Sequence, residues 1–162
     1  MRRARSGLLL LESDPWRRDS LVAFLAAEGF DVATEEGGGS EPEFVLVDLA
    51  DENGTPTARI ERIRARHPEA RVVAFVREVN ARTTFPCLMA GVKGILPHSA
   101  GSGELRNAIR CIREGSLWIR DGWPGLNVLT SGEAVLPDAA VEIFPFSAGQ
   151  ANFGARVQVA PA

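Results

Sequence analysis

Short, mostly apolar runs recur between residues 8 and 96, and polar, glycine or proline residues separate them. Four of them, at 8–11, 44–49, 71–76 and 92–96, have the length of strands that are buried on both faces of a parallel sheet. A fifth, at 30–34, alternates between apolar and polar residues, as a shorter edge strand does. The pattern therefore predicts five strands.

Helices are predicted between these strands where apolar residues stand three and four positions apart. The first begins after Asp14, the expected N-cap, and ends at Gly29, and two more cover 58–67 and 104–113. The nine residues 35–43 contain three glycines and a proline, so they will not form the helix that a parallel crossover normally carries. We therefore expect an α/β fold that lacks its second crossover helix and leaves a patch of sheet uncovered.

The segment from 80 to 91 is less regular than the other helical segments. The β-branched residues Thr83 and Thr84 and the ring of Pro86 disfavour a helix over most of its length. Only residues 87–90 are therefore predicted to be helical.

The composition changes from Trp123 onward, where charges are few and Gly, Ala and Pro are frequent. Three fragments, at 126–130, 141–146 and 156–159, favour strands. Their apolar residues make this part of the chain a candidate cover for the patch left by the missing helix, on its own chain or on a second one as a homodimer.

Asp48 lies near the end of the buried run 44–49, and Glu12 directly follows the run 8–11. Ligands of open α/β sheets bind outside the carboxyl ends of the strands, so Asp48 is a candidate site residue. The alternative is that Asp48 only caps the following loop.

The composition argues against binding to nucleic acid or lipid through overall charge, and against a secreted or membrane-spanning protein. The 162 residues are 45% hydrophobic with a net charge of −3, and the pI of about 5.5 provides no overall basic field for nucleic acid or membrane lipid. Cys87 and Cys111 form no CxxC motif, which favours a reducing, cytoplasmic location. Glu12 interrupts the apolar stretch that could start a signal peptide, and no apolar run is long enough to span a bilayer.

Five motifs within residues 7–121 point to a known family. They are Leu11-Glu12-Ser13-Asp14-Pro15, Pro42–Leu49, Ile63–Pro68, Ala90–Pro97, and Glu104–Ile109 with Gly115 and Trp118. Together they resemble a CheY-like response-regulator receiver domain of the LuxR/NarL-type branch. The resemblance implies a flavodoxin-like, doubly wound sheet of five parallel strands in the order 2-1-3-4-5. It also implies a receiver-like domain at 7–121 and a C-terminal extension at 122–162.

Receivers of this family take a phosphoryl group on the aspartate that ends the third strand. They hold magnesium with two acids after the first strand, and they use a Ser/Thr after the fourth strand and a Lys after the fifth. Asp48 matches the acceptor and Glu12 one of the two acids, so both are candidate metal ligands. Ser13 occupies the place of the second acid, Val76 that of the Ser/Thr and His98 that of the Lys.

These substitutions remove much of the phosphoryl-binding chemistry. Valine cannot bind a phosphoryl oxygen, and histidine is a weaker and shorter cation than lysine. We therefore interpret the chain as a degenerate receiver, or pseudo-receiver. It would be a non-enzymatic signalling or transcriptional module without a cofactor that binds a protein or a small ligand. The alternative is a phosphorelay receiver phosphorylated on Asp48 by a sensor kinase, with magnesium held by Glu12, Asp48 and a substitute ligand, Asp14 or Asp51.

Regulators of the LuxR branch carry a helix-turn-helix after the receiver, and Leu129–Glu133 resembles the start of one. The 29 residues after Glu133 contain one Arg and no Lys, whereas phosphate contacts require basic residues. The chain therefore has no recognisable helix-turn-helix, and binding to DNA through it is not expected. A third reading is a DNA-binding regulator whose output domain is vestigial.

Overall fold

The computed structural model describes residues 5–35, 41–50, 56–120, 139–144 and 154–159. None of the helices in these ranges is long and apolar enough to cross a membrane.

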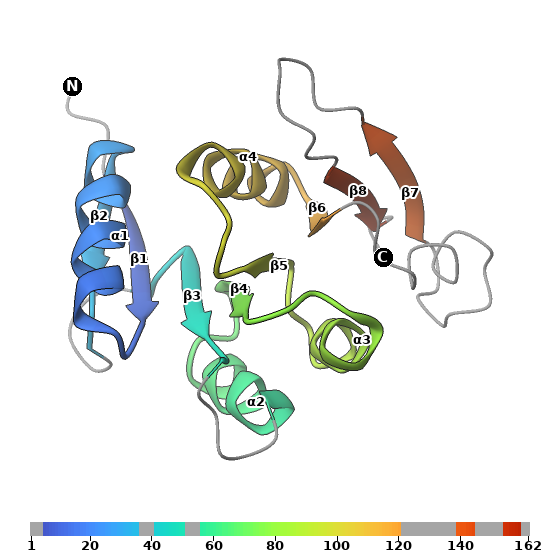
Figure 1. Cartoon of the computed structure of the whole chain (residues 1–162), viewed down its shortest axis with the longest axis horizontal. Helices are drawn as coiled ribbons and strands as arrows, with labels where there is room; N and C mark the ends of the chain where they lie inside the picture. Colours follow the sequence, from blue (N-terminus) through green and yellow to red (C-terminus); the bar gives the residue numbers. More distant parts are fainter. Residues whose placement is uncertain (1–4, 36–40, 51–55, 121–138, 145–153, 160–162) are drawn as a thin grey trace.

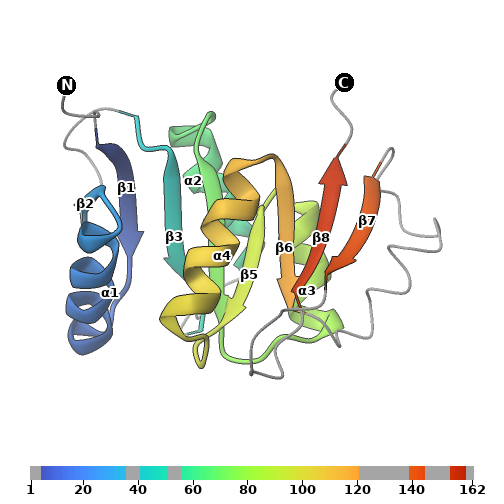
Figure 2. The ribbon, with the colours of Figure 1, turned by 90° about the horizontal axis from the view of Figure 1, so that it is seen from above.

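Six parallel strands form the centre of the molecule (Figures 1 and 2). They are β1 (Ser6–Leu11), β2 (Phe30–Ala33), β3 (Phe44–Asp48), β4 (Arg71–Val76), β5 (Gly94–Pro97) and β6 (Ser116–Arg120). The order β2-β1-β3-β4-β5 confirms the flavodoxin-like topology expected from the sequence. We did not predict β6, because its short run Leu117-Trp118-Ile119 directly follows a helix and pairs with β5 at only two positions.

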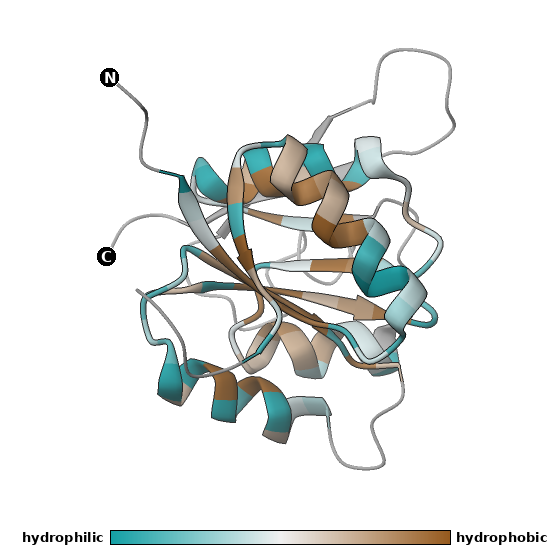
Figure 3. Ribbon diagram, turned by 90° about the vertical axis from the view of Figure 1, so that its left-hand side faces the viewer, coloured by the Kyte–Doolittle hydropathy of each residue, from teal (hydrophilic) through white to brown (hydrophobic). Residues whose placement is uncertain are grey.

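Four helices cover the two faces of this sheet, as Figure 1 shows. They are α1 (Pro15–Ala27), α2 (Pro56–Arg66), α3 (Ala81–Met89) and α4 (Ser102–Arg113). The pleat of β1 separates two apolar cores: Leu8 and Leu10 pack with residues of α1 and α4, while Leu9 packs with residues of α2 and α3. Figure 3 shows mostly apolar strands at the centre, between helices in which polar and apolar segments alternate. Asp14 is the N-cap of α1, as predicted, and accepts the N–H of Trp16 at 2.9 Å.

The prediction for the segment 80–91 was wrong, because α3 runs without a break from Ala81 to Met89. Its first turn is held by a capping box, in which Asn80 accepts the N–H of Thr83 at 3.0 Å and Thr83 accepts that of Asn80 at 3.3 Å. Pro86 removes one backbone donor, but Thr84, Cys87 and Leu88 are buried. Capping and burial together outweigh the local cost of the proline.

The second crossover contains no helix among its described residues, 34–35 and 41–43. Leu9 lies on the sheet face that this helix would cover, yet it is buried, and Leu11 and Ala33 are half-buried. No large apolar side chain of β1, β2 or β3 is exposed. The patch that we expected is therefore not exposed in the part of the chain that the structure describes.

Two further strands, β7 (Ala139–Phe144) and β8 (Gly154–Val159), extend the sheet beyond β6 (Figure 2). β8 pairs with β6 and with β7, both times in antiparallel orientation. The fragments at 141–146 and 156–159 thus fall largely in strands, and the fragment at 126–130 lies outside the described residues. Because β7 and β8 lie at the edge opposite β2, they do not supply the cover that we expected near the missing helix.

Candidate functional site

Asp48 and Glu12 lie next to each other at the carboxyl ends of two neighbouring strands. β1 and β3 are paired with Leu11 opposite Val47, so Glu12 and Asp48 occupy the following position on each strand. Both residues are buried, with Glu12 6% and Asp48 5% exposed. The fold therefore brings two carboxyl groups together in a place that water barely reaches, where each needs a polar partner.

Asp48 has two such partners on a single oxygen. Its Oδ1 accepts the backbone N–H of Ala50 at 2.9 Å and lies 2.6 Å from Nε2 of His98. His98 directly follows β5, and its own backbone N–H binds the carbonyl of Val76 at the end of β4 at 2.9 Å. Three adjacent strand ends thus position the ring of His98 against the Asp48 carboxylate.

Glu12 is held by Arg17, a residue of the first turns of α1. The Arg17 Nε donates to Glu12 Oε2 at 2.8 Å, and the Asp14 backbone N–H donates to Oε1 at 3.1 Å. A second guanidinium nitrogen of Arg17 donates to the carbonyl of His98 at 2.8 Å, and the group lies 4.6 Å from the centroid of the Phe75 ring. Arg17 therefore links Glu12 to the segment that carries His98.

The two carboxyl groups differ in acidity. Burial, together with the neighbouring Asp48, raises the pKa of Glu12 despite its bonds to Asp14 and Arg17. Burial acts in the same direction on Asp48, but the hydrogen bonds from Ala50, His98 and Glu12 outweigh it and lower the pKa of Asp48. The contact between the two carboxyl groups thus raises the pKa of Glu12 and lowers that of Asp48. The raised pKa of Glu12 and the histidine beside Asp48 both relieve the repulsion between two facing carboxylates.

The other site residues expected from the sequence take more ordinary roles. Ser13 is exposed, Val76 is buried, and the Asp14 carboxylate is used as the N-cap of α1. Asp51 lies outside the described residues. Within the described ranges, no three acidic, histidine or cysteine side chains are placed to hold a metal ion.

Sequence reasoning missed Arg17. A signal for it was present, because the N-cap at Asp14 fixes the start of α1 and thereby places residue 17 above the strand end that carries Glu12. A buried acid needs a charged or hydrogen-bonding partner, and an arginine in the first turns of the adjacent helix is a candidate.

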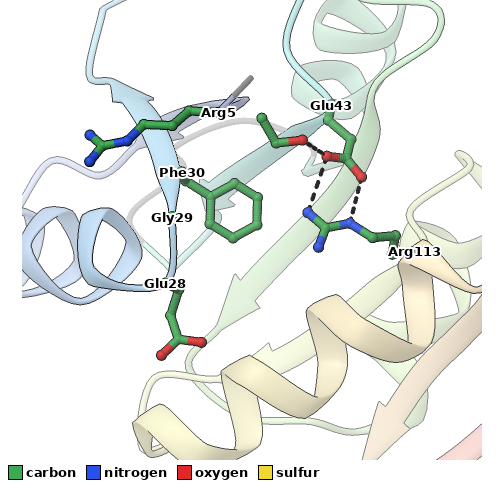
Figure 4. Close-up of a pocket in the computed structure, with 7 residues that line it drawn as sticks. Arg5, Glu28, Gly29, Phe30, Glu43 and Arg113 are labelled. Atoms are coloured by element: carbon green, nitrogen blue, oxygen red, sulfur yellow. Dashed lines mark hydrogen bonds and ion pairs between the residues drawn. The ribbon is translucent and has the colours of Figure 1, made fainter. Parts of the chain in front are cut away.

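A hollow of about 680 Å³ lies at the opposite, amino-terminal edge of the sheet, between the ends of α1 and α4 (Figure 4). Its two acids are already paired with arginines. Glu43 accepts from Arg113 at 2.8 and 3.1 Å and from Ser6, and Glu28 accepts from Arg106 at 2.7 and 2.9 Å. Because both acids of this hollow are bound by arginines, the carboxyl ends of the strands around Asp48 are the better candidate site.

Comparisons with solved structures agree with this topology. A LuxR-family two-component response regulator from Aurantimonas sp. SI85-9A1 superposes with a TM-score of 0.60 at 20% identity, over 69% of this chain and 87% of that one. A response regulator from Thermotoga maritima gives a TM-score of 0.60 at 16% identity, over 68% and 99%. The chain has the receiver fold. A CheY-like receiver domain from Methanospirillum hungatei JF-1 aligns over 66% of this chain and 92% of its own, with a TM-score of 0.58 at 16% identity.

Sequence comparisons add no closer relative, since no family model and no curated protein matches this chain. At these identities the likeness establishes the fold alone. What the receiver fold does in this chain has to be argued from its own residues.

Replacing Asp48 by asparagine tests the electrostatic balance at the site. The substitution removes the negative charge of residue 48, and with it both the repulsion between this residue and Glu12 and its attraction to His98. The amide oxygen of asparagine can still accept the Ala50 N–H. Because these effects oppose each other, we expect the free energy of unfolding to change by no more than about 1 kcal/mol in urea denaturation. A loss of several kcal/mol, or wild-type melting that depends on magnesium, would instead indicate a working ion site.

Proposed function

We propose that this chain is a pseudo-receiver, a cytoplasmic and non-enzymatic signalling module that acts by binding a protein or small ligand without phosphorylation of Asp48. The observation that carries the proposal is the pairing of Asp48 Oδ1 with both His98 and the Ala50 N–H. A phosphoacceptor carboxylate has to act as a nucleophile, whereas the neighbours of Asp48 hold its carboxylate in place and lower its pKa, which makes it a weaker nucleophile.

The cationic side chains near Asp48 are already bound to other groups, which also supports this proposal. A dianionic phosphoryl group that approaches a carboxylate needs positive charge to offset the repulsion. Arg17 is engaged by Glu12 and by the carbonyl of His98, and Val76 offers no hydroxyl to a phosphoryl oxygen. His98 would have to leave Asp48 before its ring could bind a phosphoryl group.

Trp16 supports a protein as the partner. It lies in the first turn of α1, next to Arg17, and is 86% exposed. Tryptophan is enriched at the energetic centres of protein interfaces, and a side chain of this size is seldom left in water without a use. A partner that packs on Trp16 would also lie close to the Asp48 site.

The rival function is that of a phosphoacceptor in a two-component relay. Asp48 and Glu12 stand side by side at the carboxyl ends of the sheet, as that function requires. It would need magnesium, a sensor kinase as phosphoryl donor and the release of His98 from Asp48. A vestigial DNA-binding regulator has less support, because the 29 residues after Glu133 contain one Arg and no Lys.

Beryllofluoride, which mimics an aspartyl phosphate, separates the two functions. We expect the amide NMR spectrum with magnesium and beryllofluoride to match the spectrum with magnesium alone. Clear shifts around Asp48 and Val76 would contradict the pseudo-receiver. Asp48→Asn is the matched control, because shifts that persist in this variant come from fluoride bound elsewhere.

A further inference from the structure

The outer edge of β7 is unpaired in the part of the chain that the structure describes. β7 pairs on one side with β8 over all six of its residues, and no strand in the described ranges pairs with its other side. Figure 2 shows β7 at the end of the sheet that lies opposite β2. Such an edge presents a row of backbone N–H and C=O groups that can pair with another chain.

β7 lacks the features that usually protect an edge. Native edge strands are often short, or they carry lysine, proline, inward charges or a bulge. β7 has the sequence Ala-Ala-Val-Glu-Ile-Phe, with a single charge, and its register with β8 is continuous. β2, at the other edge, has only four residues and carries the exposed Asp31. Of the two edges, β7 is therefore the one suited to pairing.

We propose that β7 pairs antiparallel with β7 of a second copy of this chain, so that one sheet runs through a two-fold symmetric dimer. A two-fold axis brings the same strand from both copies together, as an isologous interface requires. The unsatisfied backbone groups of each edge then become hydrogen-bond partners of the other.

The charge on Glu142 selects the register. Pairing centred on Val141 places Val141 opposite Val141 of the second copy, Ala139 opposite Ile143, and Ala140 opposite Glu142. Pairing centred on Glu142 uses as many residues but sets two carboxylates directly opposite each other, which is unfavourable. The Val141 register is therefore preferred.

The pattern of residues along β7 and β8 favours a second copy over an unrelated strand. Positions 139, 141 and 143 share a sheet face with positions 155, 157 and 159, and all six are Ala, Val or Ile. Glu142 and Arg156 are opposite each other in the register of the two strands, at positions that belong to the other face. Two-fold pairing continues this apolar face across four strands and keeps the charges on the other face, whereas a one-residue slip would mix them.

The mass of the full chain in solution tests the proposal. Light scattering should give twice the monomer mass of 17.4 kDa at micromolar concentrations. Val141→Lys sets two ammonium groups opposite each other and should weaken the dimer at least about tenfold. Ala140→Lys is the matched control, since its ammonium lies opposite Glu142 of the second copy and should preserve the dimer. Circular dichroism melting of both variants checks that the chain remains folded.

Cross-linking tests the register itself. Directly opposite residues have Cα atoms about 4.5–5.5 Å apart, which suits a disulfide. Under mild oxidation, Val141→Cys should form a covalent dimer and Ala140→Cys should not, both in a Cys111→Ala background. A monomer mass at every concentration, loss of the dimer in Ala140→Lys to the same extent as in Val141→Lys, or equal cross-linking at both positions would each overturn the proposal.

Discussion

Replacing Arg17 by methionine should lower the free energy of unfolding by about 3 kcal/mol at pH 7. The side chain of Glu12 is fully buried, and Arg17 supplies its charged partner at 2.8 Å. Methionine keeps an apolar stem near Phe75, so the loss reports mainly on the ion pair and on the hydrogen bond to the His98 carbonyl. Urea denaturation of the two proteins measures the difference.

This loss should shrink as the pH falls. The pKa of Glu12 is already raised by burial, and removal of Arg17 takes away a group that lowers it. A carboxyl whose folded pKa lies above its unfolded value destabilises the protein in full above the folded pKa. The penalty fades as the pH falls through the folded pKa, because the folded state then binds the proton. The variant should therefore approach the wild type at mildly acidic pH.

Two further variants test whether the pair with Glu12 is the cause. Adding Glu12→Gln to Arg17→Met should recover most of the lost stability, because the buried charge is then gone. Arg18→Met, at the next position of the same helix, should stay within about 0.5 kcal/mol of the wild type. If Arg17→Met and Arg18→Met had the same free energy of unfolding, the ion pair would not contribute to the stability of the protein.

Replacing Gly94 by alanine should cost about 2 kcal/mol, although alanine is normally the more stable residue within a strand. A Cβ at this position would lie 2.7 Å from Cδ1 of Ile112 and 3.4 Å from Cγ1 of Val73. Ile112 belongs to α4 and is only 1% exposed, so its side chain cannot turn away into solvent. The added methyl group therefore has to push α4 away from β5 or force Ile112 out of its rotamer.

Gly7→Ala provides the matched control for this overpacking. Gly7 also lies in a strand of the same sheet, but its nearest neighbour would be Cα of Pro42 at 3.5 Å, an ordinary contact. We expect its stability to be unchanged or higher by about 0.5 kcal/mol. Ile112→Val should cost less in the Gly94→Ala protein than in the wild type, since it shortens the side chain that clashes. Equal costs in the two backgrounds would show that the strain lies elsewhere.

The sequence by itself determined five of the central strands and the place of the two carboxyl groups, while the order of these strands was implied by the resemblance to receiver domains. The buried runs ending at Glu12 and Asp48 are local signals, because continuous apolar residues mark strands that are covered on both faces. Asp14 and Pro15 likewise place the start of α1, since capping depends only on neighbouring residues. The absence of a helix from the described part of the second crossover follows from its glycines and proline for the same reason.

The tertiary structure decided the features that do not depend on neighbouring residues alone, namely α3 and β6. α3 forms in spite of Pro86 because the capping box and burial against the sheet outweigh propensity. β6 becomes a strand through its pairing with β5, although it offers only a short apolar run. The contacts that bury α3 and the pairing of β6 with β5 join residues from distant parts of the chain, so a window of neighbouring residues does not contain them.

The contacts within the candidate site also depend on the tertiary structure. His98 meets Asp48 across a sequence separation of 50 residues, and Arg17 binds the carbonyl of His98 across 81. The sequence determined that acids stand at the strand ends and that a histidine replaces the lysine. That these groups pair with one another depends on distances which only the folded sheet sets, because hydrogen bonds and pKa values change within a few ångströms.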